Sequence, residues 1–274
     1  MTLELSQKDD LYFDYCQYPY KPKKAIGTAI RSVNLLFHSF DAQDCPAHYY
    51  DFVTALQKRF GRFETIFGIK LIDGKLAWEY YLYNWGKKKK DKDITSLLGM
   101  EDWFHSEIKI NENTPYFMFS IDINDNLLLN KRLENINVYT GHSYFLSKNG
   151  FSLQNFYKFY LPEDGMDDVK KDILTSVFVD FSKIKLRKVL LPELARCKSI
   201  CRARKKNCDS LYFSRIRVWQ LLWFLEHFSY PLEIINWVES HQYELYHLRF
   251  DVGYDYKMEG DKLKIIKSGY YGYF

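Results

Sequence analysis

Residues 63–85 read FETIFGIKLIDGKLAWEYYLYNW, and this stretch is the clearest guide to the fold. Two runs rich in apolar and aromatic residues flank Asp73-Gly74, a dipeptide that favours the tight two-residue turn between antiparallel strands. The stretch therefore predicts a β-hairpin.

The same arrangement of strand, turn and strand recurs along the chain. Further pairs are predicted at residues 115–126 with 132–140, at 142–161, at 196–218 and at 247–274. Asn149-Gly150 and Glu259-Gly260 supply turns for two of these pairs. With the first hairpin they amount to five hairpins and ten strands.

Helical patterns precede four of these five strand pairs. They cover residues 46–60, 94–108, 166–181, 218–228 and 231–245. Consecutive antiparallel hairpins, each introduced by a helix, can close their sheet into a barrel that the helices coat. We therefore predict an α+β fold: an antiparallel ten-stranded barrel surrounded by helices, with a solvent-accessible aromatic lumen. Residues 1–44 form an N-terminal extension packed on this barrel, and residues 45–274 form one domain.

The composition limits the function classes. Aromatic residues make up 18% of the chain and Tyr leads with 23 copies, which favours surfaces or cavities lined by rings. The net charge of +4 is too small to argue for wrapping a nucleic acid. No apolar run has the length of a membrane span and the first residues lack a signal-peptide pattern, so we expect a cytoplasmic protein with reduced cysteines and no membrane partner.

Several strands carry a cation on a face that also carries aromatic rings. In a wide barrel such side chains can line a ligand chamber rather than fill a core. The candidates are the cations Lys70, Lys158, Arg215, Arg217 and Lys267, with the in-phase rings of Phe156, Tyr160, Phe213, Tyr271 and Tyr273. Such a set of side chains would suit a prenyl diphosphate. Cations and phenol hydroxyls would neutralise the departing diphosphate, and ring faces would shield the allylic carbocation. Alternatively, the lysines reach past the strand ends to water.

Glu64 is the candidate catalytic base. A carboxylate at the mouth of an aromatic chamber has a raised pKa and can take a proton from an acceptor group as the new bond forms. The alternative is an ion pair with Lys70, which lies six residues along the same face.

Four stretches resemble the aromatic prenyltransferases with an ABBA barrel, and among them the cyanobactin peptide prenyltransferases. They are DFVTALQKRFGRFETIFGIKLIDGKL at 51–76, SIDINDNL at 120–127, RKKNCDSLYFSRI at 204–216 and VGYDYKMEGDKLKIIKSGYYGYF at 252–274. The resemblance implies transfer of a C5 or C10 prenyl group from its diphosphate, with Mg²⁺, to a side chain of a ribosomal peptide. A monomer is expected.

The resemblance also implies roles for individual residues. Glu64 matches the carboxylate beside the acceptor, and Tyr212 and Arg215 lie in the penultimate hairpin. Lys267 stands where the last strand contributes a cation to the diphosphate. Lys158 and Tyr160 resemble the Lys-x-Tyr pair that many barrel prenyltransferases use for the same purpose.

Two other functions stay open. Where the family tends to place basic residues on the second and fourth strands, this sequence has Tyr80 or Glu79 and Glu134, which suggests an inactive barrel that binds a hydrophobic or peptide ligand. A less favoured reading is a nucleic-acid-binding protein that uses the basic runs 87–90 and 202–206 beside aromatic rings. The acceptor residue and the donor length are not determined by the sequence.

Overall fold

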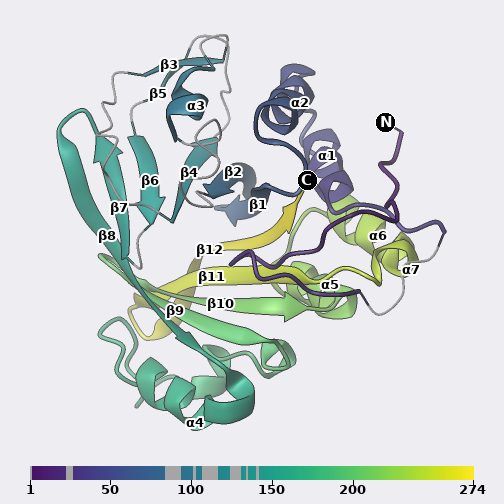
Figure 1. Ribbon diagram of the computed structural model, residues 1–274. Coiled ribbons are helices and arrows are strands. Elements are labelled where there is room, and N and C mark those ends of the chain that lie inside the picture. Colours follow the sequence, from purple (N-terminus) through teal and green to yellow (C-terminus); the bar gives the residue numbers. More distant parts are fainter. Residues whose placement is uncertain are drawn as a thin grey trace.

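The computed structural model describes residues 2–22, 27–83, 94–100, 103–106, 117–123, 131–133, 135–139 and 142–274. The protein is a mixed α+β structure built around a large, curled antiparallel sheet (Figure 1). Among the helices in this part of the chain, none is both long and apolar enough to cross a membrane.

The sheet follows the predicted strand pairs. Its strands are β1 (Thr65–Ile72), β2 (Lys75–Tyr83), β4 (Met118–Ile123), β6 (Asn135–Tyr139), β7 (His142–Ser147), β8 (Gly150–Tyr160), β9 (Ser199–Lys205), β10 (Asp209–Ile216), β11 (Phe250–Glu259) and β12 (Lys262–Tyr273). They pair in the order β1-β12-β11-β10-β9-β8-β7-β6-β4-β2, and β2 pairs again with β1, so the ladder closes into a barrel. Each of the five predicted hairpins is present as an antiparallel pair.

The first hairpin shows why the turn prediction was correct. Asp73 and Gly74 both have positive φ, of 48° and 79°, as the turn that matches the twist of two antiparallel strands requires. The register then places Ile72 opposite Lys75 and Thr65 opposite Leu82.

Helices and short segments surround the barrel. They are α1 (Val33–Asp41), α2 (His48–Phe60), α3 (Ile94–Leu98), α4 (Pro162–Ile173), α5 (Val218–His227), α6 (Leu232–Ser240) and α7 (Gln242–Leu245), with a small parallel sheet of β3 (Phe104–Ser106) and β5 (Lys131–Leu133). The main core lies between these helices and the outer face of the sheet: Phe52 of α2 packs on Tyr80 of β2, and Phe228, just after α5, packs on Tyr254 of β11.

Three helix predictions need correction, and one of them is 231–245, which is divided into α6 and α7 at His241. The pattern at 94–108 predicted one helix, but α3 covers only Ile94–Leu98 and Phe104–Ser106 is a strand. The helix predicted at 166–181 begins earlier, at Pro162, and ends at Ile173. Proline fits the first helical turn, and Glu163 and Asp164 there favour the helix N-terminus.

The N-terminal segment packs against one end of the barrel, where its dark trace runs close to β11 and β12 (Figure 1). Ser6 bonds to His247 at 3.1 Å, and the backbone N–H of Arg249 donates to the Tyr20 hydroxyl at 2.8 Å. Helix α1, which the sequence patterns did not predict, follows this segment. The basic run 87–90 and Glu134 lie outside the described residues.

Candidate functional site

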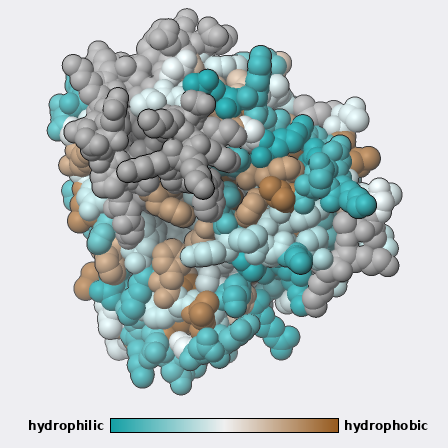
Figure 2. All heavy atoms as spheres, viewed as in Figure 1, coloured by the Kyte–Doolittle hydropathy of each residue, from teal (hydrophilic) through white to brown (hydrophobic). Residues whose placement is uncertain are grey.

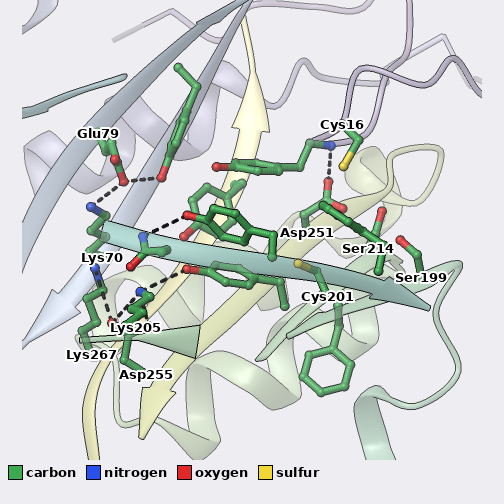
Figure 3. A pocket seen from close by; sticks show the side chains of 18 of the residues that line it. Cys16, Lys70, Glu79, Ser199, Cys201, Lys205, Ser214, Asp251, Asp255 and Lys267 are labelled. Carbon is green, nitrogen blue, oxygen red and sulfur yellow. Dashed lines mark hydrogen bonds and ion pairs between the residues drawn. The ribbon is translucent and has the colours of Figure 1, made fainter. Parts of the chain in front are cut away.

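The interior of the barrel contains a cavity of about 230 Å³. Along β2, β9, β11 and β12 the lining residues all lie on one face of the strand, as expected for the inner face of a sheet closed on itself. Its polar lining includes Lys70, Glu79, Lys205, Asp251, Asp255 and Lys267. Figure 3 shows Lys70, Glu79, Lys205, Lys267 and Asp255 gathered at one end, and Asp251, Ser214, Ser199 and Cys16 at the other.

Asp255 of β11 organises the first end. The ammonium of Lys205 lies 2.8 Å from both carboxylate oxygens, and that of Lys267 lies 3.6 Å from Oδ2. The Ser210 hydroxyl donates to Oδ1 at 2.5 Å. Burial disfavours the ionised carboxylate, but the two ammonium groups and the hydroxyl together hold the pKa of Asp255 below its usual value. Asp255 is therefore a carboxylate that anchors two cations.

The other carboxylate at this end belongs to Glu79 of β2. It forms an ion pair with Lys70 of β1 and accepts a hydrogen bond from the Tyr81 hydroxyl. Ser120 of β4 donates to its second oxygen at 2.9 Å. The pair is buried, and these hydrogen bonds offset part of the cost of removing both charges from water.

Lys267 shows that cations exceed anions here. Repulsion from Lys70 and Lys205 lowers the pKa of Lys267, and burial lowers it further, against the attraction of Asp255 and Glu79. A neighbouring anion would favour the charged ammonium. The lysine cluster, defined as Lys70, Lys205 and Lys267, is thus suited to receive an anionic group.

Tyrosine rings form much of the wall, and glycines make room for them. A Cβ at Gly68 would lie 2.7 Å from Cε1 of Tyr271, and a Cβ at Gly253 would overlap the ring of Tyr212. The Tyr212 hydroxyl lies 3.3 Å from the ammonium of Lys205. The rings of Tyr212 and Tyr271 therefore lie across the inner face of the sheet, beside the lysine cluster.

Asp251 lies at the opposite end of the cavity. Its carboxyl accepts backbone N–H groups of Tyr15, at 2.9 Å, and of Arg215, at 3.2 Å. Burial, followed by repulsion from Asp14, raises the pKa of Asp251 to about 7. Tyr15 and Cys16 bring the N-terminal segment into the wall, and the Tyr15 ring contacts Tyr271 with ring centres 4.9 Å apart.

Five of the sequence-predicted residues line this cavity: Lys70, Tyr212, Phe213, Lys267 and Tyr271. They come from β1, β10 and β12, which pair through β11 and through the β1–β12 ladder. For β1 and β12 the predicted inner face is the observed one. On β10 it is not, because Tyr212 and Ser214 face the cavity in place of Arg215 and Arg217.

The prediction for β8 was wrong in phase. Tyr157 and Phe159 line the cavity, whereas Lys158 and Tyr160 lie on the outer face. The side chain of Lys158 is 54% exposed and its ammonium lies 3.8 Å from Asp172 of α4. Phe156 is also outside, with its ring 5.2 Å from that of His142. Figure 2 shows apolar surface among polar surface over this part of the barrel.

The end of β10 also differs from the prediction. A bulge between Phe213 and Ile216, with φ of 59° at Arg215, interrupts the alternation. Arg215 consequently turns to the N-terminal segment, where its Nε donates to Asp14 at 2.7 Å. Arg217 is exposed at the start of α5. The Phe213 residue borders the cavity, but its ring stacks on Tyr254, with centres 6.0 Å apart, in the core under the helices.

Two further predicted residues lie away from the cavity. Tyr273 packs near Phe63, with ring centres 6.0 Å apart, and is not among the described residues that line the cavity. Glu64 comes directly before β1 and is likewise absent from that lining. The prediction that Glu64 lies at the mouth of the chamber is therefore not supported. The carboxylate that pairs with Lys70 is Glu79.

Sequence reasoning missed Lys205, Asp251 and Asp255. Lys205 was read as part of a basic run that could contact nucleic acid. Asp251 and Asp255 share a strand face with Gly253, which must lack a side chain because Tyr212 lies over it. That spacing of carboxylates around a glycine was the available signal for an inner face.

A scan of protein-family models and a search of curated proteins each returned no match for this chain.

Proposed function

We propose that the protein binds an allylic prenyl diphosphate in the barrel and transfers its prenyl group to a side chain of a peptide. The observation that carries the proposal is the lysine cluster, whose cations outnumber the carboxylates beside it and whose neighbours are tyrosine rings. The barrel would then be of the ABBA type that the sequence resembles.

The lysine cluster would bind the diphosphate. Lys205 and Lys267 already lie beside one carboxylate, and Lys70 beside another, so their ammonium groups are held in place before any ligand arrives. Preorganised cations stabilise the charge that develops on a leaving diphosphate without having to reorient during the reaction. The Tyr212 hydroxyl, next to Lys205, would add a hydrogen bond.

The tyrosine walls would protect the reacting carbon. As the C–O bond to the diphosphate breaks, positive charge develops on the allylic group, and ring faces attract such a charge. The Tyr212 hydroxyl lies 3.3 Å from the Lys205 ammonium, and Tyr271 lies on the same face of β12 as Lys267. These two rings would hold the cation and exclude water until the acceptor reacts.

Mg²⁺ enters this proposal only with the donor. Within the described ranges, no group of three or more His, Cys, Asp or Glu side chains is arranged to hold a metal ion. Mg²⁺ commonly binds through substrate phosphates rather than an all-protein cage. It would therefore accompany the diphosphate, and the roles assigned above belong to the side chains alone.

An inactive binding protein is the second candidate, and the pairing of Lys70 with Glu79 favours it because that carboxylate competes with an anionic ligand. The nucleic-acid alternative has less support. In the run 202–206, Arg202, Arg204 and Lys205 form ion pairs with Asp172, Asp209 or Asp255 within the protein.

Incubation with dimethylallyl diphosphate or geranyl diphosphate, Mg²⁺ and a mixture of linear and cyclic peptides tests the proposal. Mass spectrometry should show a peptide that has gained one C5 or C10 unit, together with free diphosphate. Donor binding without any such product would support the inactive binding protein instead. Failure to bind either donor would contradict both.

A further inference from the structure

The carboxyl of Asp251 has no part in the donor site proposed above. It lies on the same strand face as Asp255 but four residues away, which corresponds to about 13 Å along a strand. Asp251 is only 7% exposed and it lines the cavity. In Figure 3, Asp251 lies at the end away from the lysine cluster.

The surroundings of Asp251 differ from those of the other two carboxylates in the cavity. Glu79 and Asp255 are each paired with lysines, whereas both oxygens of Asp251 accept neutral backbone N–H groups, from Tyr15 and Arg215. The Ser214 side chain adds a third hydrogen bond. Because a carboxylate offers about four acceptor sites, about one remains for a ligand. The two backbone donors also fix the orientation of the group.

Other titratable groups face Asp251 from several elements. They are Asp14, Cys16 and Tyr20 of the N-terminal segment, Tyr83 of β2, Cys197 before β9 and Arg215 of β10. Arg215 and Asp14 form an ion pair at 2.7 Å, which partly cancels their charges. Burial raises the pKa of Cys16 to about 12, so this thiol stays protonated near neutral pH. Burial and repulsion from Asp14 raise the pKa of the Asp251 carboxyl toward neutral pH, which suits a group that has to take up a proton.

We propose that the acceptor binds at this end of the cavity and that Asp251 receives the proton of its reacting O–H or N–H group. This inference rests on the proposed prenyl transfer. The C–O bond of the donor breaks and its electron pair leaves with the diphosphate. The acceptor atom forms the new bond to the allylic carbon, and its proton passes to the Asp251 carboxylate.

The assignment places the two substrates at separate ends of one cavity. The donor needs cations, and the acceptor needs a group that takes its proton. Lysines around a carboxylate would lower its pKa and so make it a poor proton acceptor. Separation along β11 keeps Asp251 available. The substrate class that follows is a neutral side chain with a transferable proton, presented at the end of the barrel where the N-terminal segment forms part of the wall.

The test compares Asp251→Asn with Asp14→Asn as a matched control. Both substitutions remove one carboxylate from the same end of the barrel, but Asp14 is not among the described residues that line the cavity. Transfer from dimethylallyl diphosphate is measured with the blocked amino acids N-acetyl-tyrosine amide, N-acetyl-tryptophan amide and N-acetyl-serine amide. Binding of the unreactive analogue dimethylallyl thiolodiphosphate is measured by calorimetry, and retained binding shows that a variant is folded.

Asp251→Asn should lower kcat by about 10²–10⁴-fold, the usual contribution of a general base, while analogue binding stays within about twofold. Asp14→Asn should change kcat much less. In the wild type, kcat should rise with pH up to about 7, because the carboxylate must be ionised to accept a proton, and this rise should disappear in Asp251→Asn.

Three results would overturn the assignment: an unchanged kcat in Asp251→Asn, equal losses in both variants, or a pH profile that Asp251→Asn retains. A wild-type protein that binds the analogue but alkylates none of the acceptors would also overturn it, leaving the donor site in place. A wild-type protein that does not bind the analogue would instead contradict the proposed function on which the assignment rests.

Discussion

Two lysine–aspartate pairs, whose lysines are on neighbouring strands, lie on opposite sides of the barrel wall. Lys205 of β9 meets Asp255 inside, at 2.8 Å, with side chains 14% and 7% exposed. Lys158 of β8 meets Asp172 outside, at 3.8 Å, and its own side chain is 54% exposed. Water screens the outer pair, whereas the inner pair lies in a confined space where each charge acts strongly on its neighbours. The side of the sheet, more than the residue type, decides which cations can serve a ligand.

Removing Lys205 should have the largest effect on the stability of the protein. Lys205→Ala leaves Asp255 buried beside Lys267 alone, and loss of one partner of a buried ion pair typically costs about 3–5 kcal/mol. Urea denaturation should show that loss in the free energy of unfolding, and Lys158→Ala should show no measurable change. Equal stabilities for the two variants would mean that the inner pair is as well solvated as the outer one.

Gly253→Ala sharpens the account of the inner wall. The new Cβ would overlap the Tyr212 ring, and overpacking of this kind costs about 1–3 kcal/mol. Gly74→Ala is not a suitable control because Gly74 has a positive φ. The double variant Gly253→Ala with Tyr212→Ala is the better one, since it removes the overlap and should show a smaller penalty for the added methyl group. A Gly253→Ala protein as stable as the wild type would show that Tyr212 can lie elsewhere.

The sequence could predict the hairpins but only part of the inner face. Turn dipeptides such as Asp73-Gly74 act locally, so the pairing of neighbours was accessible without tertiary information. The inner face was accessible on β12, where Lys267 and Tyr271 alternate with residues of the opposite face. On β8 it was not, because rings occupy both faces: Phe156 lies outside and Tyr157 inside. The usual contrast of apolar and polar faces is absent there.

A bulge and a distant segment limited the rest. The bulge before Ile216 redirects Arg215. The alternating pattern of a strand does not reveal where an extra residue is inserted. The partner of Arg215 is Asp14, about 200 positions earlier in the chain, and that contact forms only when the N-terminal segment packs on the barrel. The inner role of Asp251 depends on the same packing, since Tyr15 supplies one of its hydrogen bonds.

The carboxyl of Asp251 should make the stability of the protein depend on pH. The pKa of Asp251 is about 7 in the folded protein, above its ordinary value, so the folded state holds a proton that the unfolded chain releases. Its contribution to stability is fully present at acidic pH, below the unfolded pKa, and is lost as pH rises through about 7. Urea midpoints of the wild type and Asp251→Asn between pH 5 and about pH 8 measure this contribution. A wild-type midpoint that falls no more steeply than that of Asp251→Asn would contradict the shift.

The smallest effect is expected at Glu64. This residue is not among the described residues that line the cavity, so Glu64→Gln should leave prenyl transfer near the wild-type rate. Product formation from dimethylallyl diphosphate, followed by mass spectrometry, checks this beside Asp251→Asn. A loss of about 10²-fold or more in Glu64→Gln would restore Glu64 as the base and remove that role from Asp251.

The most direct measurement of the central claim is calorimetric binding of dimethylallyl thiolodiphosphate, with Mg²⁺, to the wild type, Lys267→Ala and Lys158→Ala. Charge-assisted contacts are worth about 1.5–3 kcal/mol, so Lys267→Ala should bind roughly tenfold to a hundredfold more weakly. Lys158→Ala should bind as the wild type does, because its ammonium lies outside the barrel. Absence of binding to the wild type, or equal weakening by both substitutions, would contradict a diphosphate site at the lysine cluster.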